Sequence, residues 1–255
     1  MILSAIDTTP DCRLKVDFIM ENQTIIVTGL SNREFLERHA QPGRIGLCGG
    51  STNVDIAIRR AQRHLHAAGR WSDWSHAFVF EGTRADGRHW VVESDLQILR
   101  KHIQLGAQEN RVEKYSDEKM FPALAVLDFG LDETQLATLM REALELVARR
   151  ERYSLRELVG TLIALRKPEL RARENLLARE HSAYCSAFVQ QLFLKTGIDL
   201  VPGVTGKNTT PEDISLTPVP HTAYRLQRET APGKISQLKR KISVRVRAGL
   251  RKLKR

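Results

Sequence analysis

Three residues of this chain, His76, Glu93 and Cys185, have side chains that could together carry out nucleophilic catalysis. His76 lies in the segment WSHAFVFE and Glu93 in HWVVES, and the loop 82–87 between them is rich in turn residues, which predicts a β-hairpin. Side chains alternate between the two faces of a strand, so an even-membered turn places His76 opposite or diagonal to Glu93 on one face. A one-residue bulge would separate them, and the sequence leaves that alternative open.

Cys185 opens a predicted helix that continues through Leu194, with Ser182 as a candidate cap. In the first turn of a helix, the unsatisfied backbone N–H groups and the helix dipole favour a thiolate. A nearby imidazole would act as a base and later protonate the leaving group, while a carboxylate would fix its tautomer. The backbone N–H of Cys185 or Ser186 would help to hold the oxyanion. The chemistry expected of this set is acyl transfer through a thioester.

The elements that must position these residues are strands in the first half of the chain and helices in the second. Besides the hairpin, apolar patterns predict strands within residues 15–30, at 123–129 and at 222–227, and a short apolar run covers 45–48. They predict helices from residue 53, over 133–149, from 154, over 185–194 and at the segment TTPEDI. This order favours an α+β domain with an antiparallel sheet over alternating βαβ units.

Complete motifs for nucleotide or metal binding do not occur in the sequence. The segment 203–208 has two residues between its glycines where a phosphate loop has four, and it ends in Asn208 where that loop needs Ser or Thr. His64 and His66 are two residues apart on a predicted helix, so they face different directions, which favours a solvated helix face over a metal site. The three cysteines include no C-x-x-C pair. We therefore expect no metal and no cofactor.

Short segments of the chain resemble the circularly permuted papain-like hydrolases related to the NlpC-type cell-wall peptidases, in particular the YaeF/YiiX/YebB-like group. They occur in the family's order and are GRIGL at 43–47, SHAFV at 75–79, VVE at 91–93, YCSAFV at 184–189 and TTPEDI at 209–214. The resemblance implies a permuted papain-like fold with Cys185 as nucleophile, His76 as base and Glu93 as orienter. The family's opening motif often has Asp at the position of Arg44.

Some residues near this set have rival or additional roles. Cys48, in a glycine-rich loop before a predicted helix, is the rival nucleophile, and His181, one helical turn before the predicted nucleophile, is the rival base. Tyr153 and Tyr184 are each open to two interpretations, simple packing or a hydroxyl that lines the active cleft. Together with Ser186, these tyrosines are the predicted substrate-binding residues.

Positive charge is concentrated at the C-terminal end. The chain has 40 Lys and Arg against 30 Asp and Glu, and residues 234–255 hold ten of the basic residues and no acidic one, so residues 1–233 carry 30 of each and no net charge. Apolar residues recur with a helical period in 234–255, which predicts a basic amphipathic helix on an anionic membrane surface. Nucleic acid and a plain solvated terminus are the alternative interpretations.

We therefore predict an N-terminal extension over 1–40, a permuted papain-like hydrolase domain over 41–233 and a basic amphipathic tail over 234–255. The first residues lack the pattern of a secretory signal, and no run approaches the roughly 18 apolar residues of a membrane span. The expected location is therefore the cytoplasm, and peripheral binding to the inner face of the membrane is the alternative. The expected function is a cysteine hydrolase that cleaves an amide or peptide bond through a covalent thioester. A lipid acyl hydrolase or acyltransferase of the same fold, and a catalytically silent papain-like module tethered by its tail, are the alternatives.

Overall fold

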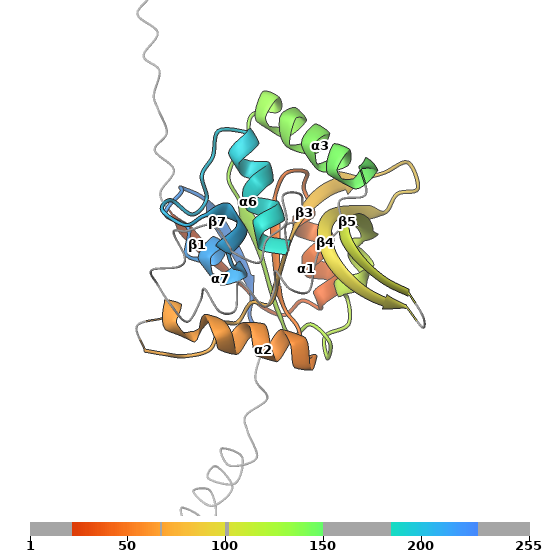
Figure 1. Cartoon of the computed structure of the whole chain (residues 1–255). Helices are drawn as coiled ribbons and strands as arrows, with labels where there is room; N and C mark the ends of the chain where they lie inside the picture. The colour runs from red at the N-terminus through yellow and green to blue at the C-terminus, as the bar shows by residue number, and fades with distance from the viewer. Residues whose placement is uncertain (1–21, 67, 100–101, 150–184, 229–255) are drawn as a thin grey trace, which may run out of the picture.

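The computed structural model describes residues 22–66, 68–99, 102–149 and 185–228 (Figure 1). Their framework is a seven-stranded sheet of order β1-β7-β6-β2-β3-β4-β5. The strands are β1 (Gln23–Val27), β2 (Ile45–Gly49), β3 (His76–Thr83), β4 (His89–Leu99), β5 (His102–Arg111), β6 (Ala123–Asp128) and β7 (Thr222–Leu226). The β1–β7 pair is parallel and the other five pairs are antiparallel.

Helices cover both faces of this sheet. They are α1 (Asn32–His39), α2 (Asn53–Ala61), α3 (Glu133–Ala148), α6 (Cys185–Lys195) and α7 (Pro211–Ser215), with the 3-10 turns η1 (Gln62–Leu65), η2 (Val112–Tyr115) and η3 (Gly206–Asn208). Capping boxes open four of the helices, at Ser31, Thr52, Asp132 and Thr210. In each box a side-chain oxygen accepts a hydrogen bond from a backbone N–H that the helix itself leaves unpaired. Among the described residues, no helix is long and apolar enough to cross a bilayer.

The alternation of side chains along the central strands divides the core into two parts. On one face, Leu47 and Val79 pack with Phe188 of α6 and with residues of α3. On the other face, Phe78 packs with Phe35 of α1 and with residues of η2. Each strand of the central sheet is therefore buried on both sides, which makes the sheet a rigid support for residues at its strand ends.

The predicted α+β class is confirmed, and the circular permutation stays a prediction. Residues 22–40 were assigned by sequence to an N-terminal extension, but β1 pairs with β7 and Phe35 and Leu36 of α1 are fully buried, so the body begins before residue 41. The predicted helix from residue 154 and the predicted tail over 234–255 lie outside the described residues.

Candidate active site

The β3–β4 hairpin places His76 and Glu93 on the same face of the sheet. Glu93 pairs with Phe78, two residues along from His76, so the two side chains are diagonal neighbours. The hairpin does contain a bulge, between Phe80 and Gly82. Its loop, residues 84–88, has an odd number of members, and the extra residue of the bulge restores the parity that keeps the pair on one face.

Glu93 is fully buried and its carboxylate accepts hydrogen bonds from four side chains. Oε2 accepts from His76 Nε2 at 2.6 Å and from the Tyr115 hydroxyl. Oε1 accepts from Asn110 Nδ2 at 2.7 Å and from Lys114 Nζ at 2.8 Å. Burial works to raise the pKa of Glu93, but hydrogen bonding to His76 and the charge of Lys114 outweigh it and hold the pKa far below the ordinary 4.5. The carboxylate is therefore ionised, and His76 donates to it through Nε2–H.

Cys185 is the first residue of α6, and it lies close enough to His76 that its charge and hydrogen bonding raise the pKa of the ring. Because Nε2 of the ring is bonded to Glu93, Nδ1 is the atom left for the sulfur. Burial works to lower the pKa of His76, but the charge and hydrogen-bond interactions with Cys185 and Glu93 together raise it well above the ordinary 6.5. An imidazolium beside a thiol at the start of a helix is the arrangement that favours a reactive thiolate.

Three hydrogen bonds made by Ser75 fix the backbone immediately before His76. The Ser75 N–H donates to the carbonyl of Cys48 at 2.8 Å, and its hydroxyl donates to Asp55 Oδ1 at 2.7 Å. The same hydroxyl accepts from the N–H of Gly50 at 2.9 Å. These bonds tie the start of β3 to the end of β2 and to the first turn of α2, so the position of the imidazole is set by backbone that is itself held on two sides.

Cys48, the rival nucleophile, lies inside β2 and not in a glycine-rich loop as the sequence predicted. It pairs with His76 across β2 and β3, but it is 1% exposed and packs in the core between the sheet and α1. Burial, followed by the charges of Glu93 and Asp55, raises the pKa of its thiol well above 9.0. A protonated thiol out of reach of a substrate is unsuited to nucleophilic attack, so the geometry favours Cys185.

The remaining predicted site residues differ in what the structure says of them. The side chain of Ser186 is fully buried and donates to the carbonyl of Thr209 at 2.7 Å, so it joins α6 to the segment before α7. Ser186 can therefore bind an oxyanion through its backbone N–H, in the first turn of α6, and not through its side chain. Tyr153, Tyr184 and His181 lie outside the described residues.

The prediction that His66 lies on a solvated helix face is wrong. Its Nε2 lies 2.8 Å from Glu212 Oε1, and the two side chains are 9% and 3% exposed. Glu212 also accepts a hydrogen bond from the hydroxyl of Ser72. This buried group joins η1 to α7, which sequence spacing within one helix could not reveal because the partner is distant in the chain.

The three side chains other than His76 that donate to Glu93 were not predicted from the sequence. Asn110 belongs to β5, and Lys114 and Tyr115 belong to η2 directly after it. A signal for this strand exists, because Ile103, Leu105 and Ala107 alternate with polar residues. The roles of the three side chains depend on the β4–β5 pairing and carry no local sequence signature.

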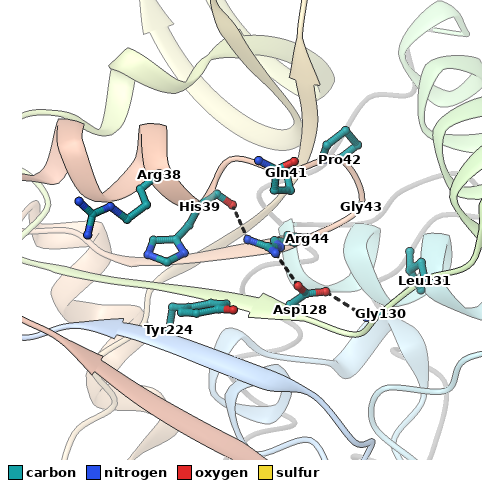
Figure 2. Close-up of a pocket in the computed structure, with 10 residues that line it drawn as sticks. All are labelled: Arg38, His39, Gln41, Pro42, Gly43, Arg44, Asp128, Gly130, Leu131 and Tyr224. Carbon is teal, nitrogen blue, oxygen red and sulfur yellow. Dashed lines mark hydrogen bonds and ion pairs between the residues drawn. The ribbon is translucent and has the colours of Figure 1, made fainter. Parts of the chain in front are cut away.

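No cation site emerges from the described residues, which contain no group of three or more His, Cys, Asp or Glu side chains placed to hold a metal ion. The cavity in Figure 2, of about 500 Å³, is separate from the candidate site. It lies at the Arg44 end of β2, whereas His76 pairs with the other end. Its Arg44 guanidinium lies 2.6 Å from Asp128 and donates to the carbonyl of His39, and no cysteine lines it.

No family model and no curated protein matches the chain. Among solved structures it is similar to the crystal structure of the metalloprotein YiiX from Escherichia coli O157:H7, with a TM-score of 0.47 and 15% identity. The match covers 75% of this chain and 98% of the YiiX chain. The match and the sequence motifs name the same group. At this level of likeness the comparison carries no argument about activity, which is argued from the geometry above.

The Glu93→Gln variant is expected to titrate His76 at a lower pH than the wild type. Glu93 supplies one of the negative charges that raise the pKa of His76 above 6.5, so its removal leaves the imidazolium less stable. The measurement is an NMR titration of the His76 ring protons. Asp95→Asn is the matched control, because Asp95 bonds Lys114, whereas the groups that raise the pKa of His76 are Cys185 and Glu93. Equal titration of His76 in the wild type and in Glu93→Gln would show that the carboxylate does not act on the ring.

Proposed function

We propose that this protein is a cysteine hydrolase that cleaves an amide or peptide bond through a covalent thioester on Cys185. The observation that supports this most strongly is the connected series of Cys185 at the start of α6, His76 beside it, and the buried, ionised Glu93 behind His76. Each member has the type and the neighbour that its role requires: nucleophile, base and orienter.

In the first half of the reaction, the Cys185 thiolate attacks the substrate carbonyl carbon and forms the new C–S bond. The carbonyl oxygen becomes an oxyanion, held by backbone N–H groups in the first turn of α6. As the C–N bond breaks, the imidazolium of His76 gives its Nδ1 proton to the departing amine. The product of this half is a thioester between the acyl group and Cys185.

In the second half, water attacks the thioester carbonyl while neutral His76 accepts a proton from it at Nδ1. The C–S bond breaks, the acid leaves, and the thiolate–imidazolium pair is restored. Throughout, Glu93 accepts from Nε2–H and so keeps Nδ1 directed at the reacting atoms. Tyr115, Asn110 and Lys114 act as positioning residues, because their hydrogen bonds fix the carboxylate.

The test is alkylation by a fluorescent iodoacetamide at about pH 6, where an ordinary thiol is protonated and reacts slowly. The label should map to Cys185 in the wild type and in Cys48→Ser, and should be absent from that site in Cys185→Ser. Label that survives Cys185→Ser and disappears in Cys48→Ser would overturn the assignment of Cys185 as the nucleophile.

The acyl donor is identified by incubating the protein with amide and phospholipid libraries and measuring its intact mass. A thioester formed only from phospholipid would replace amide cleavage by lipid acyl hydrolysis, and no thioester from any donor would argue for a silent module.

A further inference from the structure

The helix α2 is amphipathic, yet it carries no fully buried side chain. Val54 is 48% and Ile56 is 39% exposed, and nearby Trp71 is 48% and Met120 45% exposed. These four are half of the eight large hydrophobic side chains that are exposed in the described part of the chain. Single exposed apolar residues are ordinary, but a gathering of this kind marks an interaction surface.

Three of these side chains are assigned to one region of the surface, which we call the α2 face and define as Ile56, Arg60, Trp71 and Met120, whereas Val54 is two residues from Ile56 on the helix and faces another direction. The N–H of Ser51, just before α2, donates to the carbonyl of Met120 at 2.9 Å. Ile56 and Arg60 are one helical turn apart, and the Arg60 guanidinium lies 5.9 Å from the centre of the Trp71 ring. The face therefore runs from Met120 along α2 to Trp71.

Segment 51–71 carries a net positive charge, and Asp73, just beyond it, pairs with Arg70. Segment 51–71 holds four arginines, Arg59, Arg60, Arg63 and Arg70, and a single acidic residue, Asp55. Asp55 is occupied within the fold, because it bonds Thr52 and Ser75. Apolar side chains and a tryptophan set among arginines are the composition that suits the interface of an anionic bilayer. Nucleic acid would use the arginines but has no use for exposed Ile56 and Met120.

The helix of the α2 face is bonded, through Asp55 in its first turn, to Ser75, the residue directly before His76. In Figure 1, α2 lies along the lower edge of the molecule, far from α3 at the upper edge. A surface bound through α2 would therefore lie at the same end of the sheet as His76.

We propose that the α2 face docks this protein on an anionic membrane surface, with Trp71 at the level of the lipid headgroups. The proposal goes beyond the hydrolase function and does not depend on it. It is also distinct from binding through residues 234–255, because it assigns the contact to the folded body.

The experiment uses the full chain and vesicles of phosphatidylglycerol and phosphatidylcholine with brominated acyl chains, which quench tryptophan on contact. Trp71 is the reporter, since Trp74 is 3% exposed and the ring of Trp90 is covered by Arg84, whose guanidinium lies 4.2 Å from its centre. We expect quenching and a blue shift in the wild type. Trp71→Phe should lose the signal and still sediment with the vesicles, which assigns the signal to this residue.

Ile56→Ser combined with Arg60→Glu should weaken vesicle binding, measured by the quenching of Trp71, about tenfold or more. The double substitution removes an apolar contact and reverses a charge. The matched control is Leu144→Ser with Arg141→Glu on α3, where Leu144 is 41% exposed, and it should bind like the wild type. Sedimentation with vesicles without Trp71 quenching would place the contact elsewhere in the chain and overturn the proposal. A blue shift that depends on protein concentration and not on lipid would assign the α2 face to contact with a second copy of the chain. A blue shift produced only by RNA would assign the face to nucleic acid. Either result would also overturn the membrane proposal.

Discussion

The His76→Ala variant is expected to transfer an acyl group from a p-nitroanilide to Cys185 about 10²- to 10⁴-fold more slowly than the wild type. The variant lacks both the charge that favours the thiolate and the proton that the departing amine requires. With the matching p-nitrophenyl ester the loss should be smaller, because p-nitrophenolate leaves without a proton. The burst of chromophore in rapid-mixing experiments measures both rates. A larger loss for the anilide than for the ester is specific to a proton donor, and a merely structural residue would slow both alike.

Two further histidines provide the comparison. His89 lies at the other end of the same hairpin, with its Nδ1 3.0 Å from the hydroxyl of Thr83, and His89→Ala should leave both rates unchanged. His181 is the rival base from the sequence, and His181→Ala should also leave them unchanged. If His181→Ala produced the anilide-specific loss and His76→Ala did not, the base would be assigned to the wrong histidine. Thermal unfolding of each variant confirms that the rates refer to folded protein.

The parts of the fold that the sequence predicted well are those set by local signals. The helix expected over 133–149 is α3, Glu133–Ala148, because Asp132 forms a capping box and the apolar residues have a helical period. The β3–β4 hairpin follows from two apolar runs and a turn-rich loop. By contrast, β5 was not predicted, although its alternation was present, and residues 22–40 were set outside the body. The parallel pairing of β1 with β7 joins residues about 200 apart in the chain, and no local pattern specifies such a pair.

The candidate site divides in the same way. Strand parity predicted that His76 and Glu93 share a face only for an even-membered turn without a bulge. The loop is odd-membered and β3 is bulged, and the pair shares a face because these two departures cancel. The four donors around Glu93 depend on tertiary structure, since Lys114 and Tyr115 reach it only because η2 folds back from β5. The burial of Cys48 likewise depends on α1, an element that the sequence analysis did not contain.

Glu93→Leu is expected to lower the free energy of unfolding by about 3–5 kcal/mol, the range for removing one partner of a buried charged pair. Leucine fits the buried site in size but accepts no hydrogen bond, so the hydroxyl of Tyr115, a residue that is 1% exposed, loses an acceptor that water cannot replace, and Lys114 keeps only its bond to Asp95. Urea denaturation measures the change. Glu118→Leu is the matched control, because the Glu118 side chain is 46% exposed and pairs with Arg228 at the surface, which predicts a loss of at most about 1 kcal/mol.

The pH dependence separates the charge of Glu93 from its packing. The pKa of Glu93 in the fold is below its ordinary 4.5, so its charge contributes stability above about pH 4.5, and this contribution is lost as the pH falls toward the folded pKa. Glu93→Gln keeps the shape and removes the charge. The difference in unfolding free energy between wild type and Glu93→Gln should therefore narrow in acid, below the higher pH range in which the different His76 pKa values of the two proteins also change it. A difference that does not change with pH would mean that the four donors recognise the shape of this side chain and not its charge, and Glu93 could then not be the group that holds His76 as an imidazolium.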